Sequence, residues 1–533
     1  MAIERGLAAG LQHRAAGLWR VPRTGWQRLV SRLRARLGGP ARLRVIVLLA
    51  CVLGLDTADL SSLGAVASKL KPALRLDNTQ LGLLAAAPSL VAVLATLPMG
   101  VLADRFPRVR TLAVAVAIWA AGMIMAGACG SFEELLVVRL FLGGVTAAAA
   151  PFVASLVGDL FPPAERGRIY GYILAGELLG AGFGLIASGN VAAASWRAAL
   201  WVLALPSLAV AVGLWRLLPE PARGGASRLT RGARAMRTRP QAKHERQAAR
   251  AAEPAEGGRR SAAVERAVER SGTSPRRELV LTRDPVRMSA WSAARYVLRV
   301  RTNVWLIIAS SLGYFFQAGV NTFGVVFVIA VFRVSQTAAT WLLALIAGGA
   351  LAGTVLGGRV ADALLARGRA SARMLVAGLA FIVCSLLFAL GLLTRDLAIA
   401  LPIYIAAAAL LGAPNAPVDA ARLDIIPSRL WGRAEAVRTV LRSLAVATAP
   451  LMFGVLSDAL ASGARSTTKG FGYHASGPGL RYSFLLMLAP MAAGGAILLR
   501  SAGAYTRDVA TAIASDEAIE RDREAHRARA AAG

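Results

Sequence analysis

The chain has 533 residues, of which 56% are hydrophobic and only 17% are charged, so it is too apolar for the surface of a soluble globular protein of this length. Its formal net charge of +31 comes from basic residues that concentrate outside the apolar runs. That distribution is typical of membrane-protein loops and tails, and we expect contact with anionic membrane lipids rather than nucleic acid, because the basic segments lack interleaved aromatics and any nucleic-acid fold signature.

The first segment, residues 1–43, alternates apolar side chains with arginines. This pattern suits a helix that lies on an anionic bilayer surface, and a disordered basic tail fits it equally well. The first strongly apolar stretch begins near Val45 and continues into a full-length helix without a small-residue cleavage site. We therefore expect no cleaved signal peptide.

Apolar segments long enough to cross about 30 Å of hydrocarbon follow in two groups. The first group comprises 45–66, 79–103, 111–129, 134–158, 169–190 and 197–218. The second comprises 303–331, 338–361, 373–394, 397–417, 438–460 and 480–500. The sequence therefore predicts an all-α membrane protein with twelve transmembrane helices in two pseudo-symmetric six-helix bundles, at 44–220 and 303–502.

A basic segment at 221–302 separates the two groups, and residues 503–533 follow the second. The linker is rich in Ala, Arg, Gly and Glu and has no long apolar run, which predicts a solvated connector that is partly helical or disordered. The C-terminal tail mixes acidic and basic residues, as a short exposed helix or a disordered tail would.

The charge of the loops predicts the orientation in the membrane. Every second loop is basic, and only the loop with Lys69, Lys71 and Arg75 departs from this alternation. Because basic loops stay in the cytoplasm, we expect a multi-pass protein of the cell (inner) membrane with both termini and the linker cytoplasmic.

One short pattern occurs at the same place in each half. The second helix of the first half runs into Gly100-Val-Leu-Ala-Asp104-Arg105, and the second helix of the other half runs into Gly358-Arg-Val-Ala-Asp362. Each joins a small residue that permits close packing to a carboxylate at a helix end, with a basic loop beyond. Two matched occurrences indicate a duplicated half, and parallel repeats suit a transporter whose halves rock about a central site.

On these residues the chain resembles the major facilitator superfamily over nearly all of residues 44–502. The stretch from Gly100 to Arg110 resembles the family's signature between helices 2 and 3, with Pro107 where Gly is usual, and the glycine-rich run 176–184 resembles its helix 5. Arg139-Leu-Phe-Leu-Gly-Gly resembles its helix 4 pattern. Trp119, Pro151 and the Leu-Pro-Glu-Pro run ending at Pro221 resemble the Spinster-like branch, whose Asp-Arg pair in helix 1 is absent here.

The resemblance implies a gate at the cytoplasmic helix ends, where the helix 2 carboxylate contacts the other half in the outward-facing state. The residues expected to act in gating are Asp104, Arg105, Arg108, Asp159, Glu165, Arg166, Asp362, Arg367 and Arg369. Removing one such contact is expected to shift the conformational equilibrium rather than abolish binding.

Charges inside the apolar runs are costly and therefore need a partner or a function. Asp56 and Asp59 lie three apart on one helix face and form a candidate proton site, unless both lie at the wet end of their helix. Glu177 is a candidate for proton coupling or for an interhelical hydrogen bond, and Arg139 is expected to pair with a carboxylate or to snorkel. Arg442 lies too deep for snorkelling to explain it well.

Uncharged polar candidates for the substrate or proton pathway are Gln317, Asn321 and Asn415, which could equally be interhelical hydrogen-bonding residues. Gln317 and Asn321 lie four apart on one helix face. The three cysteines lack metal-ligand spacing, and no phosphate-binding glycine loop is present, so we expect no cofactor, no metal and no direct use of ATP.

We therefore expect a monomeric secondary active transporter, and not an enzyme, that exports a small hydrophobic or amphipathic molecule in exchange for protons by alternating access. The alternatives are a Spinster-like exporter of lysolipids and a transport-inactive membrane scaffold or regulator that recruits partners through the linker. A lipid-modifying enzyme would need nucleophiles, metal ligands or acid pairs in the interfacial loops, and the sequence has none.

Overall fold

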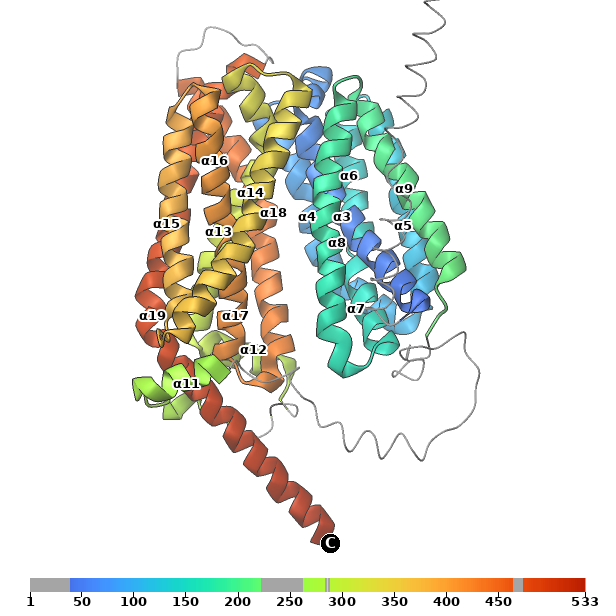
Figure 1. Ribbon diagram of the computed structural model, residues 1–533. Coiled ribbons are helices and arrows are strands. Elements are labelled where there is room, and N and C mark those ends of the chain that lie inside the picture. Colours follow the sequence, from blue (N-terminus) through green and yellow to red (C-terminus); the bar gives the residue numbers. More distant parts are fainter. Residues whose placement is uncertain (1–38, 222–261, 283–284, 286–287, 464–472, 533) are drawn as a thin grey trace, which may run out of the picture.

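The computed structural model describes residues 39–221, 262–463 apart from 283–284 and 286–287, and 473–532. These residues form two helical bundles that lie side by side (Figure 1), and no strand occurs among them. The all-α fold class is confirmed. Most of the predicted N-terminal tail and the first part of the linker lie outside the described residues.

The first bundle contains the helices from residues 40 to 217. They are α3 (Pro40–Leu74), α4 (Asn78–Arg105), α5 (Arg108–Ala128), α6 (Phe132–Thr146), α7 (Ala149–Leu160), α8 (Pro163–Ala192) and α9 (Trp196–Leu217). Side-chain caps begin several of them. Asp77, for example, accepts a hydrogen bond from the backbone of Gln80 at 2.6 Å and forms a capping box with that residue at the start of α4.

The second bundle contains the helices from residue 301 onward. They are α13 (Arg301–Phe332), α14 (Gln336–Ala366), α15 (Ala372–Leu393), α16 (Leu397–Gly412), α17 (Asn415–Ile425), α18 (Trp431–Gly463) and α19 (Tyr473–Ala532). The last stretch of α19 projects well beyond its bundle (Figure 1).

Among the described residues, 11 helical segments are long and apolar enough to cross a membrane. One of these segments consists of α6 and α7, and another consists of α16 and α17. The fourth helix of each half is therefore broken into two pieces. The predicted first span lies in α3, which is outside those 11 but packs along α8 within the bundle. Long apolar helices satisfy their backbone hydrogen bonds internally, as crossing lipid requires.

Small residues permit the closest helix pairs. Along α8, Gly176, Gly180 and Gly184 each face the backbone of α3, so a side chain at any of them would collide with it. In the second bundle, Gly353 and Gly357 of α14 meet the backbone of α16 and the turn after it in the same way. Within a membrane the hydrophobic effect does not drive helices together, because lipid is as apolar as their side chains. Close packing of this kind therefore holds the helices together.

The later part of the linker forms structure against the second bundle. It contains α11 (Ala262–Ser271), the short helix Arg277–Leu279 and α12 (Ala290–Arg299). The backbone N–H groups of Arg276 and Leu281 donate to Thr511 and Ser515 of α19, at 2.9 and 3.1 Å. We call the end of the molecule at which the linker lies the linker end, and the opposite end the far end.

Hydrogen bonds join the two bundles at the far end. Gln336 donates from its side chain to the carbonyl of Ala65 at 2.7 Å and accepts from the hydroxyl of Ser68. Asp458 accepts from the backbone of Thr79 at 2.7 Å. The first residues of α14 and of α4, the second helices of the two halves, thus each contact the opposite bundle.

Candidate functional site

A buried ion pair lies inside the first bundle. Arg139 of α6 donates to the carboxylate of Asp59 of α3 at 2.7 Å, and both side chains are less than 5% exposed. Because one charge neutralises the other, neither is left alone in the apolar interior. The sequence left two alternatives for Arg139, pairing with a carboxylate or snorkelling, and the structure contains the pair.

Asp56 lies in a different environment from Asp59. It lines a pocket with Trp119 of α5 and with Val145, Thr146 and Ala149, which flank the break between α6 and α7. Within the described part of the chain, its carboxylate makes no hydrogen bond or ion pair, and the buried indole N–H of Trp119 also has no acceptor. The two helix 1 acids therefore differ: one is paired and the other faces a pocket.

Glu177 and Arg442 bring one charge from each bundle near the middle of the molecule. The guanidinium of Arg442 lies 4.8 Å from the ring centre of Tyr314. Among the described residues it forms no ion pair with Glu177, although the two charges are near enough to act on each other across the interface. The carbonyl of Glu177 accepts a hydrogen bond from Thr57 at 2.7 Å, which fixes this part of α8 against α3.

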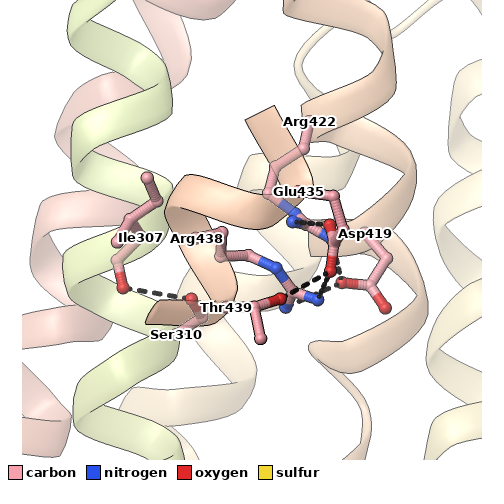
Figure 2. A network of polar contacts seen from close by, with 7 residues as sticks. All are labelled: Ile307, Ser310, Asp419, Arg422, Glu435, Arg438 and Thr439. Carbon is pink, nitrogen blue, oxygen red and sulfur yellow. Dashed lines mark hydrogen bonds and ion pairs between the residues drawn. The ribbon is translucent and has the colours of Figure 1, made fainter. Parts of the chain in front are cut away.

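Four charged side chains form a network between α17 and α18 of the second bundle (Figure 2). Arg422 donates to Asp419 at 2.7 Å and to Glu435 at 2.6 Å. Arg438 donates to Glu435 at 2.5 Å and more weakly to Asp419, at 3.4 Å. Two guanidinium groups thus share two half-exposed carboxylates, and the network carries no net charge.

Arg108 anchors the linker end of the first bundle. It pairs with Asp159, donates to Ser155 at 3.0 Å and donates to the carbonyl of Pro221 at 2.8 Å. Glu220 accepts from the backbone N–H of Arg108 at 2.8 Å and so caps the start of α5. Glu165, a further gating candidate, pairs with Arg42 of α3.

The second bundle repeats this anchor. Arg373, the second residue of α15, pairs with Asp424, the last residue but one of α17, and Tyr505 donates to the same carboxylate at 2.5 Å. Arg108, the first residue of α5, and Asp159, the last residue but one of α7, hold nearly the same places in the first bundle. Each anchor joins residues of a single half, so each stabilises its own bundle.

The other gating candidates are not brought together. Arg105, Asp362, Arg367 and Arg369 are exposed and have no hydrogen bond or ion pair to a described side chain. The side chains of Asp104 and Arg166 lie outside the described residues. The backbone carbonyl of Asn321 lies against Gly64 of α3, whereas Gln317 and Asn415 line one pocket of the second bundle.

Sequence reasoning missed several of these charges. Asp419, Glu435 and Asp458 were absent from the candidates, because each lies near a polar helix end where a charge needs no special explanation. Asp419 and Glu435 each pair with an arginine three residues away on their own helix, a spacing that could have shown them. The partners of Asp458 come from α4, and no local spacing reveals that. Within the described residues, no group of His, Cys, Asp and Glu is arranged to hold a metal ion.

The sequence matches the Major Facilitator Superfamily over residues 48–450. The chain belongs to this superfamily. The resemblance seen in the motifs is thereby confirmed.

Known relatives are similar over part of their length. The 4-hydroxybenzoate transporter PcaK of Pseudomonas putida is 29% identical over 181 residues, which cover 34% of this chain and 40% of that protein. The 3-(3-hydroxy-phenyl)propionate transporter of Escherichia coli (strain K12) is 29% identical over 168 residues, or 32% of this chain and 42% of that protein. The matched stretches therefore span about two fifths of these relatives.

Solved structures share the fold over nearly their whole length. A bacterial homologue of the human lysosomal transporter Spinster, in an inward-facing and occupied conformation, superposes with a TM-score of 0.65 at 19% identity, covering 88% of this chain and 98% of that one. The nucleoside transporter NupG gives a TM-score of 0.58 at 12% identity. At these identities the similarity shows the fold alone.

Proposed function

We propose that the chain is a secondary active transporter that couples the movement of protons to that of a small amphipathic anion. The observation that carries this proposal is the placement of two intramembrane charges of opposite sign in different halves, Glu177 in α8 and Arg442 in α18, near enough for their charges to act on each other without forming an ion pair in this state. A charge pair divided between two bundles that move against each other changes its energy with conformation. Protonation of Glu177 would remove its attraction to Arg442 and so link proton binding to that movement.

The substrate class follows from the surroundings of these charges. Each bundle contains a pocket that combines apolar walls with a few polar groups, as sites for amphipathic molecules do. The two relatives named above are transporters of aromatic carboxylates that bear a hydroxyl group, which supports an anion with an apolar body. The linker end is proposed to face the cytoplasm of a monomeric protein in the cell (inner) membrane, in contact with anionic lipids.

The alternating-access cycle is proposed to start from a state closed at the far end, where Asp458 and Gln336 join the halves. Substrate would then reach the site from the linker end. Export, which the sequence analysis favoured, and uptake would use the same site and differ in the direction of the driving gradient. The gating residues predicted at the linker end are proposed to meet only in the opposite state.

Transport by purified protein in liposomes tests the proposal. Radiolabelled 4-hydroxybenzoate should move across the membrane when a pH gradient is imposed, and a gradient of each sign gives the direction. Glu177→Gln keeps the size of the side chain but removes the titratable group, so it should bind the probe and no longer respond to the gradient. The exposed residue Glu133 supplies the matched control, and Glu133→Gln should transport normally.

Three results would contradict all or part of the proposal. Gradient-driven transport by Glu177→Gln would show that Glu177 is structural and would move the coupling role to Asp56. Transport of a fluorescent lysolipid in place of the aromatic acid would favour the Spinster-like alternative. No transport of either probe would favour the scaffold role. The intramembrane charges argue against that role, because charges inside a membrane are costly and usually serve transport.

A further inference from the structure

The two broken helices occupy equivalent places in the two halves. The fourth helix of the first bundle breaks between α6 and α7, and that of the second breaks between α16 and α17. Pro151 is the third residue of α7, and Pro417 is the third residue of α17. Proline lacks the N–H that would continue the helix, and its ring clashes with the carbonyl one turn earlier, so both breaks have the same cause.

Repeat-related helix interruptions are a common feature of transporter binding sites, because they expose polar backbone beside a cavity. Each break here borders a pocket. The first pocket, with Asp56 and Trp119, is otherwise lined mainly by aliphatic side chains. The second, at the turn before α17, has about 330 Å³ of empty volume, part of it open to the outside.

Polar groups from three helices converge on the second pocket. Tyr314 and Gln317 come from α13, Asn415 comes from the start of α17, and Arg438 comes from α18. Among the described residues, the amides of Gln317 and Asn415 and the hydroxyl of Tyr314 have no hydrogen-bond partner, although each lines the pocket. Phe381, Leu411 and Val418 supply apolar walls to the same space.

Arg438 has one strong and one weak partner. One terminal nitrogen, Nη2, lies 2.5 Å from Glu435, whereas the other, Nη1, lies 3.4 Å from Asp419. Asp419 is half exposed and is held at 2.7 Å by Arg422. The weak contact can therefore be replaced by another carboxylate while Asp419 keeps its bond to Arg422 and Arg438 keeps its bond to Glu435 (Figure 2).

We propose that this second pocket binds the polar end of the transported molecule, with a carboxylate of the ligand taking Nη1 of Arg438 and the amides of Gln317 and Asn415 hydrogen-bonding the ligand's polar end. The assignment rests on the proposed function, whose substrate class it makes specific. Tyr314 connects the pocket to the coupling charges, because the ring that lines it also carries Arg442 against its face. Ligand in the pocket thus lies one side chain away from the residue that interacts with Glu177.

The chain offers a matched control for this assignment. Gln317 and Asn321 lie one turn apart on α13, but only Gln317 lines the pocket. The pair Gln317→Ala and Asn415→Ala should together raise the KM for 4-hydroxybenzoate about tenfold in liposomes, as expected for the loss of two hydrogen bonds. Asn321→Ala should leave that KM unchanged.

A second variant separates lost binding from damaged folding. Gln317→Glu keeps the size of the side chain and adds a negative charge, so it should weaken equilibrium binding of the anionic probe to the purified full chain more than Gln317→Ala does. Both proteins should melt at about the wild-type temperature.

Three results would have different meanings. If the wild type transports the probe and the double variant keeps its KM, the pocket is not the ligand site and the proposed function stands. If Gln317→Glu binds the probe better than Gln317→Ala, the anion assignment of the pocket is overturned. If the wild type itself neither binds nor transports the probe, the proposed substrate class fails, and the pocket assignment fails with it.

Discussion

The carboxylate of Asp458, in the last part of α18, accepts hydrogen bonds from both the backbone N–H and the hydroxyl of Thr79, each at 2.7 Å. The N–H of Asn78 also donates to it, at 3.3 Å. Thus a residue of one half caps the first turn of a helix in the other. The N-terminal N–H groups of a helix lack internal acceptors, and its dipole favours a negative charge there.

Asp458→Asn should weaken closure of the far end. Removing a helix cap costs about 0.5–2 kcal/mol, which corresponds to a change of roughly two- to thirtyfold in the ratio of closed to open states. Spin labels at Glu133 and Arg395, exposed residues of different halves at the far end, should report a larger population at long distance. Asp77→Asn is the control, since Asp77 caps the same helix from within its own half. An unchanged distance distribution in Asp458→Asn would show that the contact does not bias the equilibrium.

Gln336→Ala should act in the same direction through the other second helix. Its side chain is almost fully buried between the bundles and bonds both Ala65 and Ser68. Alanine would leave the hydroxyl of Ser68 without its acceptor in the closed state, which penalises that state. The same pair of labels measures the effect, and combining the change with Asp458→Asn should shift the population further than either alone.

Asp59→Asn should destabilise the first bundle. It leaves Arg139 buried without its carboxylate, and breaking a buried pair from one side costs about 3–5 kcal/mol. Thermal unfolding of the purified protein should show a lower midpoint. Asp56→Asn, three residues away on the same helix, should change the midpoint little, because Asp56 has no ion pair to lose among the described residues. Equal effects of the two changes would contradict the distinct roles assigned to these acids.

Asp159→Asn and Asp424→Asn should have similar effects, because the two carboxylates hold equivalent arginines in the two halves. Each change should lower the melting midpoint and leave the far-end label distances as in the wild type, since both anchors lie within one bundle. A change in label distances with either variant would instead assign the anchors to gating, as the sequence analysis expected for Asp159.

A cysteine at Ser274 tests the orientation of the membrane helices. Ser274 is exposed at the linker end and Arg395 is exposed at the far end. An impermeant thiol reagent added to intact cells should label Arg395→Cys and leave Ser274→Cys unlabelled until the membrane is opened. The opposite labelling pattern would invert the proposed topology.

The sequence by itself determined the fold class, the two halves and the family. Apolar runs of membrane-spanning length are a local property, and a repeated motif at Asp104 and Asp362 is visible without any coordinates. The charges at Asp59, Arg139 and Glu177 could also be singled out, because an isolated charge is conspicuous in an apolar run. Sequence reasoning missed the breaks in the fourth helix of each half. The predicted spans 134–158 and 397–417 remain apolar across the breaks, and hydropathy alone does not show that a proline interrupts a helix.

The tertiary structure alone decided which charges are partners. In the structure Arg139 pairs with Asp59 and not with Asp56. Residues three apart on a helix point in slightly different directions, and the packing of α3 against α6 places Asp59 next to Arg139. The structure also places Asp458 against Thr79, almost 380 positions away in the chain. Contacts of this kind depend on how whole helices pack, and the close approach that permits them is set by residues such as Gly82, which meets the backbone of Pro450 across the two halves.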